Sequence, residues 1–276
     1  MIYLDNGATS FPKPKGMMNA MVECMRDYCG NPGRSGHRMS MKTGEEIYKA
    51  RKELGKLFHI EDCGRIIFTS NTTESLNLGI KGVLERGDHV ITTSMEHNSV
   101  LRPLKMQEDS GVETTIVKCA GDGSLNVETL KKEIKDNTKL IVCTHASNVT
   151  GTILPVKEIG ALAKQKGILF MVDGAQSAGC IPIDVIDLKI DMLALPGHKG
   201  LLGPMGTGML YVSDSVAIRP LKEGGTGTKS RELDQPTDFP DGYEAGTVNA
   251  PGIIGLGHSC SYISGIGVEN IRAYEE

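Results

Sequence analysis

The sequence contains no tract of clustered Lys and Arg, and its 276 residues carry a formal net charge of -4. Because nucleic-acid phosphates are bound by clustered basic side chains, this composition argues against a nucleic-acid partner and favours a small-molecule one. The N-terminus lacks a basic stretch followed by an apolar one, and nowhere do about 18 consecutive apolar residues occur. We therefore expect a cytoplasmic protein without a membrane partner.

The spacing of metal ligands is also missing. The seven cysteines are scattered, none of them paired in the C-x2-C pattern of a zinc site, and the seven histidines are equally dispersed. An odd number of cysteines, mostly in apolar stretches, is typical of buried free thiols in a reducing compartment. The sequence therefore predicts no structural metal.

What is present is the pattern of an α/β fold. A chain with 39% hydrophobic residues can bury a full core. From residue 65 onward, short β-rich apolar runs alternate with amphipathic helical stretches, which is typical of a parallel sheet covered by helices. The strands are expected at Arg65–Thr69, His89–Thr93, Glu113–Lys118, Leu140–Thr144, Ile168–Val172 and Asp191–Leu195.

Helices are expected on both sides of this region. Apolar spacing and cap residues predict them at residues 16–29, 41–59, after the Thr72-Thr73 pair, before the fifth strand from Val156, and at Gly252–Tyr274. The stretch 222–250 is rich in Gly, Thr and Asp and predicts a long irregular segment, which in a compact domain is more often functional than idle.

The common nucleotide-binding loops are poorly matched. The stretch from Gly224 to Ser230 lacks the G-x-x-x-x-G-K spacing of a P-loop, and no G-x-G-x-x-G follows the first expected strand. A plain Rossmann-type binding protein is therefore weakly supported.

Polar side chains follow several of the expected strands. In doubly wound sheets, ligands lie outside the carboxyl ends of the strands, where residues distant in sequence converge. After the first strand, Asn71, Thr72 and Thr73 open a helix whose free N–H groups would suit an anion such as phosphate. An ordinary helix cap would give the same pattern.

Two charged residues stand at the ends of later strands. Asp173 ends a wholly apolar strand, where a carboxylate needs a cation such as a protonated pyridine nitrogen, although a turn-capping Asp is an alternative. Lys199 lies in the small-residue turn Pro196-Gly197-His198-Lys199-Gly200. A desolvated lysine there could form an imine, although most lysines are solvated surface residues. Only the combination of these groups indicates one site.

Several motifs occur in the order and approximate spacing of the class V aminotransferase group of pyridoxal 5'-phosphate (PLP) enzymes, which have fold type I. They are Tyr3-Leu4-Asp5-Asn6-Gly7-Ala8-Thr9, Thr72-Thr73-Glu74, Met95-Glu96-His97-Asn98, Ser147-Asn148-Val149-Thr150-Gly151, Val172-Asp173-Gly174-Ala175-Gln176, Gly197-His198-Lys199 and Glu244-Ala245-Gly246-Thr247. The sequence most resembles the cysteine desulfurase and selenocysteine lyase branch. The resemblance covers essentially the whole chain and implies a PLP-dependent transferase-like large domain, with a mostly parallel sheet of about seven strands covered by helices.

The resemblance implies catalytic roles for two residues and a charge partner for the cofactor. Lys199 would form the Schiff base with PLP and later shuttle protons. His97 would stack on the ring face, although it could instead be a surface residue at a strand end. Asp173 would keep the ring nitrogen protonated.

The remaining cofactor contacts are implied in the same way. Gln176 would bond the ring oxygen, and Asn148 would lie beside that oxygen and the substrate carboxylate unless it only forms a turn. The phosphate would be held by Thr72, Thr73 and His198, and by Gly225 and Thr247 reaching across from a partner subunit, which implies a homodimer.

The sequence also departs from the family. Pro196 replaces a common Ser and supplies no hydroxyl to the phosphate. Family members continue into a smaller domain that carries the nucleophilic cysteine and an arginine for the substrate carboxylate. The resemblance therefore implies an N-terminal segment (1–15), a PLP-binding large domain (16–250), and the start of a helix to an absent small domain (251–276).

The expected reaction converts L-cysteine, or L-selenocysteine, to L-alanine and passes the sulfur or selenium to an enzyme thiolate. A sulfur-acceptor protein is an expected partner. We expect little or no turnover from this chain alone. Another class V activity (aminotransferase, epimerase or lyase) and a PLP-binding but catalytically silent fragment remain as alternatives.

Overall fold

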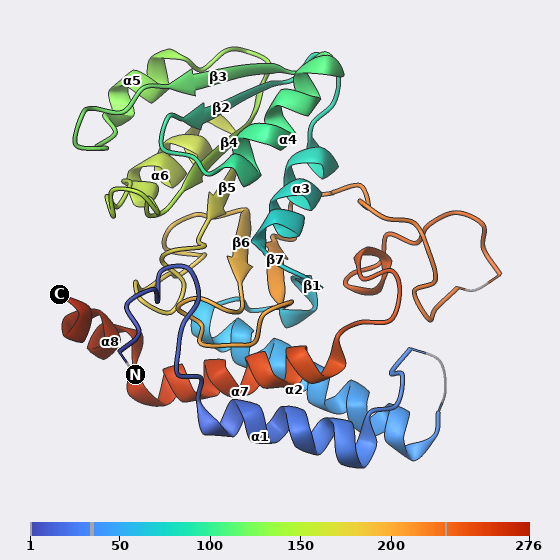
Figure 1. The fold of residues 1–276 in the computed structure, drawn as a ribbon. Helices are drawn as coiled ribbons and strands as arrows, with labels where there is room; N and C mark the ends of the chain where they lie inside the picture. The colour runs from blue at the N-terminus through green and yellow to red at the C-terminus, as the bar shows by residue number, and fades with distance from the viewer. Residues whose placement is uncertain (1, 34–35, 230) are drawn as a thin grey trace.

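The computed structural model describes residues 2–33, 36–229 and 231–276, which form an α/β fold around one sheet (Figure 1). The strands are β1 (Ile66–Thr69), β2 (His89–Thr93), β3 (Glu113–Val117), β4 (Thr138–Thr144), β5 (Leu169–Asp173), β6 (Met192–Pro196) and β7 (Gly208–Val212). The α-helices are α1 (Lys15–Glu23), α2 (Arg38–Phe58), α3 (Thr72–Val83), α4 (Asn98–Asp109), α5 (Val127–Lys132), α6 (Val156–Lys166), α7 (Ala250–Ile266) and α8 (Val268–Glu275).

The sheet has seven strands in the order β1-β7-β6-β5-β4-β2-β3. Strands β6, β5, β4, β2 and β3 are parallel neighbours, whereas β7 pairs antiparallel with both β1 and β6. The carboxyl ends of β1, β2, β4, β5 and β6 therefore lie at one edge of the sheet. The loops that follow these strands can converge there, as the sequence predicts.

Helices cover both faces of the sheet because both faces are apolar. On one face, Leu76 of α3 and Leu104 of α4 belong to the same buried cluster as Val142 and Met171. On the other face, the second cluster joins helices α2, α6 and α7 to the alternate strand residues, among them Phe170. The result is a three-layer structure, in which α1, α2 and α7 form one group of neighbouring helices (Figure 1).

The α/β class and the mostly parallel sheet are confirmed, and each strand expected from the sequence is found within a few residues of its predicted place. The seventh strand, β7, was not located in the sequence because it follows β6 without an intervening helix. Helix α4 also received no prediction, and it contains Pro103. The segment 222–250 is largely irregular, as expected; its described part holds a short 3-10 helix at Asp241–Tyr243.

Helix α7 approaches α2 very closely. A Cβ atom added to Gly257 would lie 2.6 Å from the Cα atom of Ala50, so only glycine fits at this crossing. Ile253, Leu256 and Ile263 of α7 belong to the core.

Among the helices that the structure describes, none is long and apolar enough to span a membrane.

A buried carboxyl group joins two strand ends. Glu96 follows β2, and its Oε1 accepts hydrogen bonds from the Thr93 hydroxyl (2.6 Å) and from the backbone N–H of Thr144 at the end of β4 (3.0 Å). Burial raises the pKa of Glu96 to about 8, and the nearby charge of Asp173 acts in the same direction. A pKa near 8 favours the protonated form of Glu96 at pH 7, and its hydrogen bonds connect the end of β2 with the end of β4.

This carboxyl should make stability pH-dependent. Between the unfolded pKa of about 4.3 and the folded pKa of about 8, the unfolded chain ionises at Glu96 and the folded chain does not, so wild-type stability falls as pH rises. Glu96→Gln removes this effect and keeps the hydrogen-bond acceptor. In urea unfolding, we expect the stability of the variant relative to wild type to rise by about 3 kcal/mol between about pH 5.5 and about pH 8.

A stability difference between Glu96→Gln and wild type that stays constant across this pH range would show that Glu96 is ionised in the folded protein. The comparison cancels the titration of every other group, because both proteins share those groups.

Candidate active site

One pocket lies at the carboxyl edge of the sheet, where the loops after the parallel strands meet. It contains eight of the ten residues predicted from the sequence: Thr72, Thr73, His97, Asn148, Asp173, Gln176, His198 and Lys199. Gly225 and Thr247 lie outside it and line a second hollow. The remaining residues of the first pocket include Asn71, Ser99, Thr144 and Pro196.

Asp173 and Lys199 are electrostatically linked within this pocket. Asp173 is only 3% exposed, and its Oδ1 accepts a hydrogen bond from the N–H of Ala175 at 2.9 Å. Burial raises the pKa of Asp173, while that hydrogen bond and the charges of Lys199 and His97 oppose the rise. Burial also lowers the pKa of Lys199, and the charge of Asp173 opposes the fall. A buried carboxylate and a desolvated amine therefore lie near each other.

The turn that carries Lys199 is fixed by close backbone packing. The N–H of Gly197 bonds the carbonyl of Thr207 at 2.8 Å, and a Cβ atom on Gly197 would collide with the Thr207 side chain. A Cβ atom on Gly200 would collide with the carbonyl of Ala178. The small residues on either side of Lys199 therefore let the turn lie flat against its neighbours.

Two buried polar atoms in the pocket residues lack hydrogen-bond partners within the described part of the chain: Thr72 Oγ1 and His198 Nδ1. Thr72 is also the first residue of α3, where unpaired N–H groups and the helix dipole favour an anion. Burial and the charges of Lys199 and Lys13 lower the pKa of His198, so its imidazole is neutral. These donors and acceptors fit a phosphate group, since buried polar atoms normally have partners.

His97 is held in one tautomer. It caps helix α4, and its Nδ1 accepts a hydrogen bond from the backbone N–H of Ser99 at 3.1 Å. The ring proton of neutral His97 therefore lies on Nε2. The hydroxyl of Ser99 lies 2.8 Å from both His97 Nδ1 and Thr73 Oγ1, which links the two predicted site residues.

Ser99 was missed by the sequence analysis. The only available signal was its place two residues after His97, in the first turn of a helix that Pro103 obscured. Ser99 lines the same pocket as Thr72 and Thr73, so three hydroxyl-bearing residues are present there although Pro196 supplies no hydroxyl. Asn148 and His97 are exposed at the pocket, and Gln176 donates a 3.3 Å hydrogen bond to the carbonyl of Gly7.

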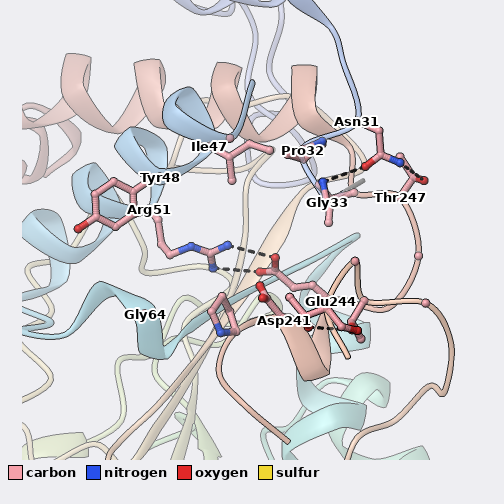
Figure 2. A pocket seen from close by; sticks show the side chains of 18 residues that line it. Asn31, Pro32, Gly33, Ile47, Tyr48, Arg51, Gly64, Asp241, Glu244 and Thr247 are labelled. Atoms are coloured by element: carbon pink, nitrogen blue, oxygen red, sulfur yellow. Dashed lines mark hydrogen bonds and ion pairs between the residues drawn. The ribbon is translucent and has the colours of Figure 1, made fainter. Parts of the chain in front are cut away.

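The second hollow contains Gly225 and Thr247 and lies beside α2 (Figure 2). The N–H of Gly246 bonds the carbonyl of Gly225 at 2.8 Å, and the Asn31 amide donates to the Thr247 hydroxyl at 3.3 Å. Gly225 and Thr247 therefore lie in the same region of the chain, outside the pocket of Lys199.

A buried ion pair anchors the loop of Thr247. Figure 2 shows Arg51 of α2 directed at Glu244, with guanidinium to carboxylate distances of 2.9 and 3.1 Å. The same carboxylate accepts a 2.6 Å hydrogen bond from the backbone N–H of Phe68 in β1. A two-point Arg–carboxylate contact fixes orientation as well as distance.

The thiols near the sheet edge are not activated. Cys180 lines a third hollow together with Lys199, but burial and Glu275 raise its pKa to about 12. Burial likewise raises the pKa of Cys143 and of Cys260. Since the thiolate is the reactive form, none of these three residues is poised as a nucleophile at neutral pH.

Comparisons with known proteins agree on one family. The model of the family described as "Aminotransferase class-V" matches residues 2–276. The chain is 36% identical over 278 residues to a probable cysteine desulfurase of Methanothermobacter thermautotrophicus, covering 99% of this chain and 69% of that protein.

Solved structures give the same result. The apo structure of a cysteine desulfurase from Thermococcus onnurineus matches with a TM-score of 0.91 and 37% identity over 97% of this chain and 68% of its own. A structure named SspA in complex with cysteine matches with a TM-score of 0.85 and 32% identity, over 95% of this chain and 73% of its own. The chain therefore belongs to the class-V aminotransferase family, as a member of its cysteine desulfurase group.

Proposed function

We propose that this protein binds PLP and uses it on L-cysteine or L-selenocysteine. The observation that carries the proposal is that Lys199 and Asp173 line one pocket, in which Thr72 and His198 carry buried polar atoms without partners among the described residues. The family is PLP-dependent, and a solved relative is in complex with cysteine. When bound, PLP supplies an aldehyde that condenses with amines and a pyridine ring that accepts electrons from a substrate carbon.

The charged and polar residues of the pocket would have different roles toward the cofactor. Asp173 would hold a proton at the ring nitrogen, because a buried carboxylate favours a cationic partner. Lys199 would bond the cofactor and, once displaced by the substrate amine, move the proton at the substrate Cα. Thr72, Thr73 and His198 would bind the phosphate.

Three further pocket residues would orient the ring and the substrate. His97 would stack on the ring face, Gln176 would bond the ring oxygen, and Asn148 would contact that oxygen and the substrate carboxylate. Because Gln176 already bonds Gly7, the N-terminal segment takes part in holding this side of the pocket.

Gly225 and Thr247 would complete the phosphate site of a partner subunit in a homodimer. Two observations support this arrangement: both residues lie outside the pocket of their own chain, and both line the same second hollow. The free cysteines agree with a reducing compartment, so we also propose a cytoplasmic protein.

The final sulfur transfer needs a thiolate that Cys143, Cys180 and Cys260 are not suited to provide. We propose that residues 16–250 form the PLP-binding domain, that residues 251–276 begin the helix to a smaller domain, and that the nucleophilic cysteine belongs to that domain. This chain would then bind cofactor and substrate but turn over little cysteine.

The proposed bond between Lys199 and PLP can be tested by chemical reduction of the adduct. We expect borohydride treatment of the protein with PLP, followed by peptide mass mapping, to place the reduced adduct on Lys199, because its amine is desolvated beside Asp173. Lys199→Ala should lose the adduct, and Lys166→Ala, a change at an exposed residue of α6, should keep it. An adduct only at other lysines would refute the assignment.

Asp173 should make PLP affinity depend on pH. Burial raises the pKa of Asp173, so lowering the pH through that value protonates the carboxylate and removes the partner of the ring cation. We expect wild-type affinity to fall as pH decreases, and Asp173→Asn to bind about 10- to 100-fold more weakly at neutral pH. Fluorescence titration with PLP measures the affinity of wild type and of Asp173→Asn at each pH.

The phosphate of PLP also titrates in this range, so the decisive quantity is the ratio of the two affinities. That ratio should shrink toward low pH. A ratio that is independent of pH would show that Asp173 does not act through its charge.

We expect this chain to catalyse exchange of the substrate α-hydrogen but to release little sulfur from L-cysteine. With PLP and L-cysteine in heavy water and thiol-free buffer, we expect NMR to show exchange of the substrate α-hydrogen, which requires only the residues of the pocket. Alanine should form in far smaller amounts than the exchanged substrate. Sustained alanine formation, together with a persulfide on a cysteine of this chain by mass measurement, would mean that this cysteine is the nucleophile, and Lys199→Ala serves as the control without exchange.

A further inference from the structure

Four hydrogen-bond donors converge on one carbonyl oxygen, that of His198. The N-terminal strap, residues 2–14, supplies all of them: the backbone N–H of Ser10 (3.0 Å), the Ser10 hydroxyl (3.2 Å), the Thr9 hydroxyl (3.1 Å) and the ammonium of Lys13 (2.8 Å). A carbonyl oxygen has two lone pairs, so this number of donors is unusual. The strap therefore grips the peptide group that directly precedes Lys199.

Lys13 is the charged member of this set. Its Nζ also donates to the Ser10 hydroxyl at 2.8 Å, so it holds the other donors as well as the carbonyl. Burial lowers the pKa of Lys13 to about 8, which leaves the ammonium as the main form at pH 7. Hydrogen bonds from a charged donor are about twice as strong as neutral ones.

The strap has one internal hydrogen bond and one further attachment to the pocket. The hydroxyl of Tyr3 donates to the carbonyl of Thr9 within the strap at 2.8 Å, and the carbonyl of Gly7 accepts from Gln176 at 3.3 Å. Ser10 is 7% exposed and lines the hollow that also contains Lys199. Gly200 of the same turn also packs closely against Ala178.

We propose that Lys13 is a positioning residue for Lys199: by holding the carbonyl of His198, it fixes the peptide plane from which the Lys199 side chain extends into the pocket. The inference rests on the proposed function, since it concerns the residue that would bond PLP. It assigns Lys13 no contact with cofactor or substrate. Preorganised geometry of this kind accelerates bond formation without changing which groups react.

The test separates bond formation from binding. Rapid mixing with PLP, borohydride quenching and mass measurement give the rate at which the Lys199 adduct forms. Titration with 4-deoxypyridoxine 5'-phosphate, which has no aldehyde, gives the affinity of the pocket alone. We expect Lys13→Met to slow adduct formation roughly tenfold and to leave the affinity for the deoxy compound within about twofold of wild type.

Matched variants complete the experiment. Lys13→Arg keeps a cation and should recover most of the rate, while Lys15→Met, a change at an exposed neighbour, should leave it unaltered. If Lys13→Met does not fold by circular dichroism, Ser10→Ala, which removes one neutral donor, should still slow the adduct by about threefold.

The outcomes are distinct. Equal losses of rate and of affinity for the deoxy compound in Lys13→Met would overturn the proposal, because they indicate a general structural role. An unchanged rate would overturn it as well. Absence of a Lys199 adduct in the wild-type protein would instead refute the proposed function itself.

Discussion

The site depends on the placement of a buried carboxylate, Asp173, near a desolvated amine, Lys199. Each group alone is costly at the end of an apolar strand, and each partly offsets the other's loss of water, as their opposing influences on the two pKa values show. Such a pair is stable only if the surrounding backbone allows little movement. The parallel order of β5 and β6, with Asp173 opposite Ala194, provides that frame.

Contacts from the surrounding elements hold the loops of His97 and Lys199 in place. Glu96 ties the loop of His97 to the end of β4, where Thr144 is the register partner of Asp173. Glycine packing fixes the turn of Lys199 from within the sheet layer, and the N-terminal strap fixes it from outside. The first residues of the chain therefore contact the turn of a residue nearly two hundred positions later, Lys199.

The sequence was informative where residue type and periodicity agree. Apolar runs located six strands, and the polar residues that follow them predicted the edge at which they meet. It was uninformative where contacts are long-range or the pattern is interrupted: β7 breaks the alternation of strand and helix, and Pro103 hides α4 and thereby Ser99. The hydrogen bond from Lys13 to the carbonyl of His198 could not be predicted from the sequence, because every residue has a backbone carbonyl and residue type does not show which one accepts the bond.

Strand β1 leads toward both hollows of the protein. Its Phe68 N–H is bound by Glu244, the residue that anchors the loop of Thr247, and four positions further along the chain Thr72 opens the helix beside Lys199. In a two-fold assembly with shared phosphate sites, one short edge strand would thus reach the cofactor of its own subunit and that of its neighbour.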